Sequence, residues 1–340
     1  MNNVAIVILN WNGKSHLENF LEKVVLYSGT YRIILADNAS TDDSIEYVRT
    51  NFPTVEIIQN KENGGFAKGY NDALKFVEAE FYLLLNSDIE VTPNWVEPLL
   101  EVMKDPTIAG CQPKILSYQN KDLFEHAGAS GGYLDKNYFP FCRGRIFDQF
   151  ETDSGQYDGE TEIFWATGAA LLIRSKLYHE SGGLDEYFFA HMEEIDMCWR
   201  LKKQGYRFVV VPKSQLFHVG GGTLSYSSPK KLYLNFRNSL FMIVKNHEGI
   251  LFFKLFNRMI LDGLAAVRFL VRGEFRNFSG VFNAHMAMYY RFRILLNQRK
   301  EIKRNSTKFN STGLYKANIL WAYYFKGITK FKDLNQRFFD

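Results

Sequence analysis

Cysteine is scarce in this 340-residue sequence, and the three that occur, Cys111, Cys142 and Cys198, form no C-x-x-C pair. Their wide spacing argues against a disulfide or zinc framework and is typical of a reducing compartment. Long apolar stretches are also missing: none reaches the roughly 18 uncharged residues that a membrane span needs, so we predict no span. The first apolar run, 4–9, has no basic segment before it and is typical of a β-strand, not of a signal peptide.

Charge is distributed unevenly along the chain. Residues 1–229 hold 20 Lys and Arg against 31 Asp and Glu, whereas residues 230–340 hold 21 against 6. The net charges are therefore −11 and +15. The hydrophobic content of 46% is that of a globular protein with a sizeable core. We expect an acidic body and a basic, aromatic region that suits an anionic partner, within one large α/β domain with an appendage or within two domains.

Strand-like and helical patterns alternate through the first half of the chain. The strand-like runs are 4–10, 32–38, 55–60 and 81–88, and the helical segments between them are 14–27, 42–51 and 67–79. This alternation predicts a Rossmann-like, mostly parallel sheet with helices on both faces. Ligands of such sheets bind beyond the carboxyl ends of the strands. The residues expected at this edge are mainly polar and include Asn10, Trp11, Asp37, Asn86 and Asp88.

The second half of the chain is less regular. Residues 164–173 and 207–212 are strand-like, and from about residue 230 the chain is helical, basic and aromatic. We therefore predict an α/β catalytic domain over 1–228 and a helical C-terminal region over 229–340.

Several polar positions have two interpretations when each is taken alone. Asp88, with Glu90 two residues later, suits a hard divalent cation, or it closes the strand as an Asx-turn. His218 is followed by glycines that favour approach of a ligand to the backbone, although a lone histidine after an apolar run is usually structural. Asp37 accepts from a nucleotide base or ribose, or it caps a turn. The glycines of 63–67 are consistent with a plain turn and cap.

An acidic segment, Glu193, Glu194 and Asp196, lies where a helix is expected to start. Carboxylates in a first helical turn interact favourably with the helix dipole, which is a structural explanation for all three. A helical wheel predicts one solvated polar face, made of Glu193, Asp196, Arg200, Lys203 and Gln204. Glu194 falls on a more apolar face instead, where a carboxylate is a candidate general base with a raised pKa.

Seven motifs then occur in a specific order. They are ILNWNG, DNASTDDS, NGGFAKGYN, LLLNSD, GAALLIRS, GGLDEYFFAHMEEIDMCWRLKKQGY and FHVGGG. Together they resemble the family-2 glycosyltransferases of the GT-A fold, and in particular the rhamnosyltransferase-like branch that builds bacterial surface polysaccharides. The resemblance covers roughly residues 3–225.

The resemblance implies roles for particular residues. Asp37 corresponds to the acid that holds the pyrimidine base, Asp88 to the last acid of the metal-binding D-x-D motif, and His218 to a histidine that completes the metal site. Glu194 corresponds to the catalytic base. The donor-binding set expected at the sheet edge is Asn10, Trp11, Asp37, Asn63, Gly65 and Asn86, and the set expected around the acceptor is Glu193, Asp196 and Gly168. Glu90 is a weaker candidate for the metal, which would be Mg²⁺ or Mn²⁺.

Two departures from the family pattern affect these roles. Asn86 stands where the D-x-D motif has its first acid, which weakens the expected hold on the metal, and the usual aspartate base is replaced by Glu194. The expected reaction is inverting transfer of a sugar from a dTDP- or UDP-sugar to a glycan or lipid-linked acceptor. The alternatives are a sugar nucleotidyltransferase and a catalytically inactive sugar-binding scaffold of a polysaccharide assembly complex.

The basic region contains an unusually apolar helical segment, 249–273. Its apolar residues surround a narrow polar stripe that begins with Lys254, Arg258 and Asp262. Such a helix either packs against the catalytic domain or lies in a membrane interface, and the net charge favours an anionic membrane. No recognised nucleic-acid-binding motif accompanies the charge. We therefore expect a cytoplasmic enzyme at the inner face of the cell membrane.

Overall fold

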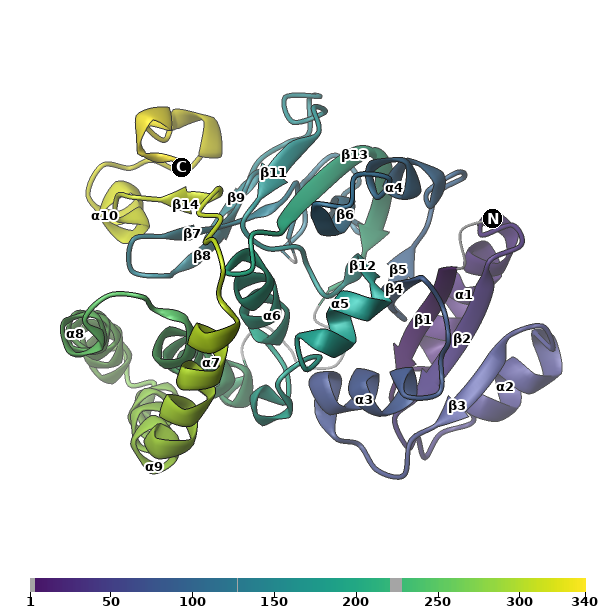
Figure 1. Ribbon diagram of the computed structural model, residues 1–340, viewed down its shortest axis with the longest axis horizontal. Coiled ribbons are helices and arrows are strands. Elements are labelled where there is room, and N and C mark those ends of the chain that lie inside the picture. Colours follow the sequence, from purple (N-terminus) through teal and green to yellow (C-terminus); the bar gives the residue numbers. More distant parts are fainter. Residues whose placement is uncertain (1–3, 127, 221–227) are drawn as a thin grey trace.

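A central mixed sheet forms the body of the protein (Figure 1). The computed structural model describes residues 4–126, 128–220 and 228–340, and within them this sheet has nine strands. Its order is β11-β13-β6-β12-β4-β1-β2-β3, and β5 pairs with β13. The strands are β1 Val4–Asn10, β2 Arg32–Asp37, β3 Glu56–Gln59, β4 Phe81–Asn86, β5 Ile89–Glu90, β6 Ile108–Ser117, β11 Thr161–Ile163, β12 Ala170–Arg174 and β13 Arg207–His218.

Helices cover both faces of this sheet. They are α1 Lys14–Tyr27, α2 Ser44–Asn51, α3 Gly65–Leu74, α4 Glu97–Val102, α5 Ser175–Glu180 and α6 Glu193–Lys202, with a 3₁₀ turn, η1 Glu186–Phe188, before α6. Side chains of β1 alternate between two cores: Ala5 and Val7 face one, and Ile6 and Ile8 face the other. A strand that is buried on both faces reads as a continuous apolar run, which is why its position was predictable.

The predicted parallel pairing is confirmed for the first half of the chain. There β1 pairs in parallel with β2 and β4, and β2 pairs in parallel with β3. The second half is mixed, because β12 lies antiparallel between β4 and β6. The prediction of a strand over 164–173 is wrong at its start, since β12 begins at Ala170, and the helix predicted over 67–79 begins earlier and ends earlier, at Gly65 and Leu74.

A second sheet was not predicted from the sequence. Its order is β10-β9-β8-β7-β14, and its strands are β7 Gly132–Asp135, β8 Pro140–Cys142, β9 Arg145–Ile146, β10 Gln149–Phe150 and β14 Leu314–Tyr315. These strands are only two to four residues long, too short for an alternating pattern. Because β14 pairs in parallel with β7, the end of the chain is part of the same body as residues 132–150.

Helices dominate residues 229–340, as predicted. They are α7 Pro229–Asn246, α8 Leu251–Val271, α9 Phe275–Asn305 and α10 Ile319–Tyr324, with two 3₁₀ turns, η2 Phe331–Asp333 and η3 Gln336–Phe338. Helix α7 packs between α9 and the body, and it contacts α6. Figure 1 shows α7, α8 and α9 gathered beside α6, far from α1 and α2.

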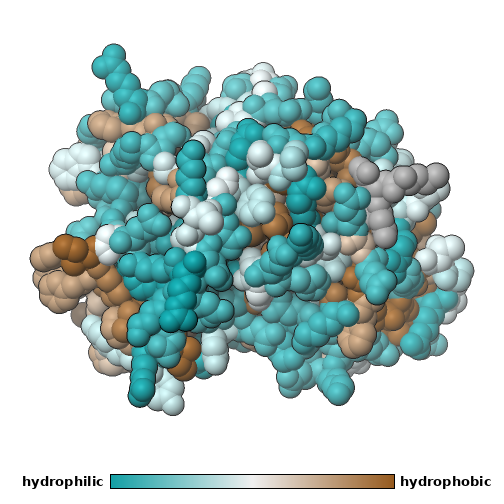
Figure 2. Space-filling view, in the orientation of Figure 1, coloured by the Kyte–Doolittle hydropathy of each residue, from teal (hydrophilic) through white to brown (hydrophobic). Residues whose placement is uncertain are grey.

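Helix α8 turns its polar stripe inward and its apolar side chains outward. Arg258 and Asp262 are buried, with Arg258 Nε 2.8 Å from Asp262 Oδ1, and the ammonium of Lys254 donates to the Lys136 carbonyl. The side chains that we call the apolar face of α8 are all at least 48% exposed: Phe252, Phe253, Phe256, Ile260, Leu264, Val267 and Val271. Figure 2 shows brown side chains at the left edge, where Figure 1 places α8. Among the described helices, none is both long and apolar enough to span a bilayer.

Candidate active site

The carboxyl ends of β1 and β2 form one corner of the site. Asn10 and Asp37 are register partners, and the Asn10 amide donates to Asp37 Oδ2 at 3.1 Å. Asp37 also accepts from the Ser40 backbone amide at 2.9 Å and from the Ser40 hydroxyl at 2.6 Å. Trp11, in contrast, is 43% exposed. Asn10 and Asp37 are thus fully buried and rigidly held beside the exposed Trp11, and their donor-binding roles stay predictions.

Asn63 and Gly65 form the adjoining loop at the start of α3. The Asn63 side-chain oxygen accepts from the Gly65 amide and from the Asn38 side chain, both at 3.0 Å. Gly65 has φ of +81°, and a Cβ on it would come within 2.4 Å of the Phe189 carbonyl oxygen. Only glycine fits this approach. These two residues thus shape the rim of the site and join it to the segment before α6, while their donor-binding role stays a prediction.

The turn after β4 carries one candidate metal ligand, Asp88, and the end of β13 carries the other, His218. Asp88 and His218 are both buried, and Asp88 Oδ1 lies 3.1 Å from His218 Nε2. On the other side of the imidazole, His218 Nδ1 lies 3.1 Å from an oxygen of Glu125. Burial alone would lower the pKa of His218, but the two carboxylates outweigh it and raise the pKa to about 10. Burial would likewise raise the pKa of Asp88, and the His218 cation holds it below its ordinary value.

Glu90 does not join this pair, contrary to the weaker expectation from the sequence. Its two carboxylate oxygens are bound by two lysines, with Lys121 Nζ at 2.7 Å and Lys23 Nζ at 3.1 Å. Because both oxygens are paired with lysines, Glu90 is not available as a metal ligand. Among the described residues, no group of three acidic, histidine or cysteine side chains has metal-binding geometry.

Asp88 and His218 nevertheless fit a divalent cation whose remaining ligands come from elsewhere. Mg²⁺ and Mn²⁺ in phosphate-binding sites are held by one or two protein ligands together with phosphate oxygens and water. A carboxylate and an imidazole nitrogen 3.1 Å apart offer two such ligands once the metal displaces the proton between them, because only a neutral imidazole binds a metal. Glu125, which contacts the second ring nitrogen, would then orient the imidazole, as partners of metal-bound histidines usually do.

The catalytic candidate, Glu194, lies at the start of α6. It is half-buried, and burial raises its pKa to about 7. The backbone amide of Gly168 favours its ionised form, and a Cβ on Gly168 would lie 3.7 Å from the Glu194 side chain. The Asn86 backbone amide donates to the Ala169 carbonyl at 2.9 Å. Residues 168–169 therefore link Glu194 to the turn that carries Asp88. The structure thus brings Gly168 beside the candidate base.

Glu193 is more deeply buried than Glu194, with 3% of its surface exposed. Burial and the neighbouring Glu194 carboxylate raise the pKa of Glu193 well above its ordinary value. Since two adjacent buried carboxyls resist double ionisation, Glu193 stays protonated when Glu194 ionises. Glu194 is therefore the carboxyl of the pair that ionises, and it belongs to the less buried residue.

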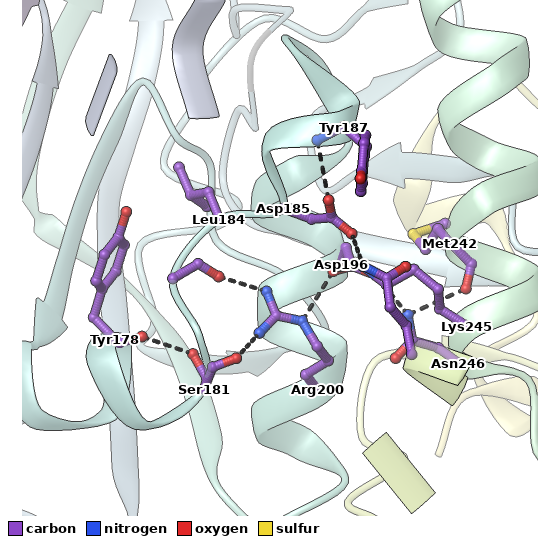
Figure 3. A network of polar contacts seen from close by, with 12 residues as sticks. Tyr178, Ser181, Leu184, Asp185, Tyr187, Asp196, Arg200, Met242, Lys245 and Asn246 are labelled. Atoms are coloured by element: carbon purple, nitrogen blue, oxygen red, sulfur yellow. Dashed lines mark hydrogen bonds and ion pairs between the residues drawn. The ribbon is translucent and has the colours of Figure 1, made fainter. Parts of the chain in front are cut away.

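The predicted solvated face of α6 is wrong. Asp196 is fully buried, Lys203 is 1% exposed and Arg200 is 8% exposed. Figure 3 shows the reason: α7 covers this face and supplies partners of its own. Lys245 Nζ lies 2.8 Å from Asp196 Oδ2 and 2.6 Å from Asp185 Oδ2, while Arg200 Nε lies 2.9 Å from Asp196 Oδ2. Asp196 and Glu193 are therefore interior residues, not acceptor-facing ones.

Helix α7 also holds the segment that leads into Glu194. The Asn238 amide lies 3.0, 2.9 and 2.7 Å from the carbonyl oxygens of Phe188, Ala190 and His191. Three residues of this segment have positive φ: 64° at Phe189, 72° at His191 and 71° at Met192. Non-glycine residues reach this conformation at a cost, so the surrounding contacts must hold it. Asn238 is buried and supplies those contacts.

Sequence reasoning missed Glu125, Asn238 and Lys245. The first follows an irregular passage, and the other two lie on a helix that reads as surface-exposed. The charge distribution offered one signal for Lys245. Residues 230–340 are basic and residues 1–229 are acidic, so a lysine of this helix can pair with a carboxylate of the body. The glycines after His218 at 221 and 222 lie outside the described residues.

The fold is the GT-A fold of glycosyltransferases. The family model described as Glycosyl transferase family 2 matches residues 5–176. The chain belongs to this family, and its relatives include rhamnosyltransferases.

Two of these relatives show the likeness over different lengths. N-acetylglucosaminyl-diphospho-decaprenol L-rhamnosyltransferase of Mycobacterium tuberculosis is 22% identical over 80% of this chain and 94% of the relative. Rhamnosyltransferase WbbL of Escherichia coli K12 is 22% identical over 63% of this chain and 83% of the relative.

Solved structures support the fold. GalNAc-T7 with UDP, GalNAc and Mn²⁺ has a TM-score of 0.54 at 17% identity, covering 72% of this chain and about half, 48%, of that chain. The mannosyltransferase PcManGT from Pyrobaculum calidifontis, in complex with GDP-Man and Mn²⁺, has a TM-score of 0.51 at 12% identity, covering 89% and 85%.

Proposed function

We propose that this protein transfers a sugar, with inversion, from a dTDP- or UDP-sugar to a hydroxyl of a glycan or lipid-linked glycan in surface polysaccharide synthesis. The observation that carries the proposal is Glu194, a carboxyl with a raised pKa, linked through residues 168–169 to the Asp88 turn. The rhamnosyltransferases among its relatives support dTDP-rhamnose as donor.

The chemistry divides between two ends of the site. Glu194 takes the proton of the acceptor hydroxyl as the oxygen forms its bond to the anomeric carbon, because a sugar hydroxyl is a poor nucleophile until a positioned base removes that proton. Asp88 and His218 would hold Mg²⁺ or Mn²⁺, which when bound neutralises charge on the departing diphosphate. With one base on the acceptor side, a single displacement inverts the anomeric centre.

Release of nucleoside diphosphate tests this function. Nucleotide-sugars are screened first for thermal stabilisation with Mn²⁺, because a ligand that binds the native state stabilises it. The stabilising donor is then incubated with acceptors, and release of nucleoside diphosphate is measured. A protein that consumes nucleoside triphosphate and makes a nucleotide-sugar is a nucleotidyltransferase, and that result would overturn the proposal. Full activity in excess chelator would remove the metal from it.

We further propose that the protein works at an anionic membrane surface, through the apolar face of α8. No other described element covers this face, and basic side chains lie near its end, including Arg268 and Arg272. Each Lys or Arg near an anionic leaflet contributes about 1 kcal/mol. The aromatic residues Trp321 and Tyr324 of α10 are exposed, and Tyr324 lies next to Arg268. Interfacial helices combine these features.

Sedimentation with liposomes tests the membrane proposal. Full-length protein should sediment with anionic liposomes and be released by high salt, because salt screens exposed charges. The variant Phe252→Ser/Phe256→Ser should lose most of this binding. The control Leu26→Ser/Phe76→Ser removes equally exposed apolar side chains from the body and should bind normally. If the Phe variant instead dissolves a dimer while liposome binding is unchanged, the face binds a second copy and the membrane proposal is wrong.

A further inference from the structure

Helix α7 carries three polar residues, Lys231, Asn238 and Lys245, spaced seven positions apart. Because seven residues make almost two turns of an α-helix, the three side chains share one face. Asn238 of this face binds carbonyl oxygens of the segment before α6, and Lys245 Nζ lies 2.8 Å from Asp196 Oδ2 (Figure 3). Lys231, in the first turn of α7, is half-buried and faces the same side. This face of α7 therefore points at the region around the candidate base.

The ammonium of Lys231 also interacts with the candidate metal site. Burial lowers the pKa of Lys231, whereas the Glu125 carboxylate favours its charged form. Glu125 in turn lies 3.1 Å from His218 Nδ1, and His218 Nε2 lies 3.1 Å from Asp88 Oδ1. A second cation, Arg145, disfavours the charge on Lys231. An anion bound near Lys231 would relieve the repulsion between these two cations.

The same ammonium acts on His191, three residues before Glu194. Burial, and then the charge of Lys231, lower the pKa of His191 to about 4, so its imidazole is neutral at pH 7. The Nε2 atom of His191 is buried and has no hydrogen-bond partner among the residues that the structure describes. A buried polar atom without a partner costs about 1–3 kcal/mol, and such an atom often marks the place of a ligand or water. A phosphate oxygen beside the Lys231 ammonium would satisfy it.

The departing diphosphate needs positive charge that the metal pair supplies only in part. Asn86 stands where the D-x-D motif has its first acid, so Asp88 and His218 offer a metal only one carboxylate. When the bond between the anomeric carbon and the diphosphate breaks, its electron pair goes to the phosphate oxygen. Lysine and arginine side chains aimed at such developing charge stabilise it in the same way as a metal ion.

We propose that Lys231 is a catalytic residue that binds the departing diphosphate of the donor, with the neutral imidazole of His191 donating beside it through Nε2. The inference rests on the proposed function and adds two residues to its donor side. The acceptor proton goes to Glu194, and the acceptor oxygen bonds to the anomeric carbon. Lys231 keeps its proton and donates a hydrogen bond to the terminal phosphate oxygen, which leaves as an anion.

Binding of nucleotides with one and with two phosphates tests the inference. UDP, dTDP, UMP and dTMP are titrated calorimetrically into the wild type, Lys231→Met and His191→Phe with Mn²⁺ present. In Lys231→Met, affinity for the diphosphates should fall at least about tenfold, because a charge-assisted contact is lost, and affinity for the monophosphates should change much less. His191→Phe keeps an aromatic ring without the nitrogen and should show a smaller loss of the same kind. The control Lys230→Met removes the same charge from an exposed neighbouring position and should behave as the wild type.

Turnover separates failure of this inference from failure of the proposed function. With the stabilising donor and its acceptor, Lys231→Met should lower kcat by about a hundredfold while KM for the acceptor stays nearly unchanged. Unchanged diphosphate affinity in Lys231→Met would overturn the assignment of Lys231, and unchanged affinity in His191→Phe would overturn that of His191. Equal losses for mono- and diphosphates would indicate a structural role and would also overturn it. If binding follows the expectation but no acceptor gains a sugar, the proposed function alone is wrong.

Discussion

Replacing the candidate base should change activity and stability in opposite directions. Glu194→Gln removes the proton acceptor, so turnover should fall by about a hundredfold or more while donor affinity stays nearly unchanged. The same substitution also removes a carboxyl group whose ionisation is disfavoured by burial in the folded protein. We therefore expect Glu194→Gln to raise the stability of the protein at alkaline pH relative to acidic pH.

The size of this stability effect follows from the pKa. Burial raises the pKa of Glu194 from an ordinary value of 4.5 to about 7. Because the folded pKa is above the unfolded one, the wild-type protein loses stability as pH rises from about 4.5 through about 7. One pKa unit corresponds to 1.36 kcal/mol, so the loss approaches about 3 kcal/mol. At pH 5 most of this cost is absent, and at pH 8 it is fully present.

Urea unfolding of wild type and Glu194→Gln at pH 5 and pH 8 measures the effect. From pH 5 to pH 8, the free energy of unfolding of the variant relative to the wild type should rise by up to about 3 kcal/mol. Comparing the two pH values cancels any packing change that does not depend on pH. Activity should rise with pH through an apparent pKa near 7. Glu193→Gln should change turnover much less, since Glu193 stays protonated. A pH-independent stability difference, or a crippled Glu193→Gln enzyme with an active Glu194→Gln enzyme, would refute the assignment.

Four further substitutions test the rest of the site. Asp88→Ala should abolish Mn²⁺-dependent binding of nucleoside diphosphate in calorimetry, and His218→Ala should weaken it; unchanged binding in both variants would exclude them as ligands. Glu125→Gln should lower Mn²⁺ affinity by about 10- to 100-fold through the orientation of His218, as seen by calorimetry or electron paramagnetic resonance, and unchanged affinity would contradict that role. Asn238→Asp places a carboxylate among three carbonyl oxygens and should lower kcat with little change in donor affinity, whereas Asn235→Asp on the same helix should have little effect; equal losses would show a general effect on α7.

The sheet and its polar edge were predictable because their pattern is local. A strand such as β1, buried on both faces, appears as an uninterrupted apolar run. The carboxyl ends of parallel strands meet at one edge, so Asn10 and Asp37 had to be neighbours once the strands were recognised. The helical wheel separated Glu194 from Glu193 but reversed their burial, because Glu193, predicted to be solvated, is the more deeply buried of the two.

The errors came from partners that are distant in the sequence. Asp196 and Arg200 look like solvated residues on a wheel, because nothing in α6 indicates that Lys245 of α7 covers them. Glu90 follows Asp88 at a spacing that suits a metal site, yet Lys23 and Lys121 occupy both its oxygens. A polar residue carries the same signal whether it faces water or a buried opposite charge, so single-sequence reasoning places it on the surface by default.

The helices after residue 228 contact the body of the protein and also expose an apolar face. On one side, Lys245 neutralises the buried carboxylate of Asp196, which lies in the same first turn of α6 as Glu194. Removing one partner from a buried ion pair costs about 3–5 kcal/mol, a large fraction of the stability of an ordinary domain. On the other side, the same helices expose the apolar face of α8. The domain boundary at 228 stays a prediction, and any movement of α7 against the body would act directly on the segment that holds the base, because Asn238 contacts that segment.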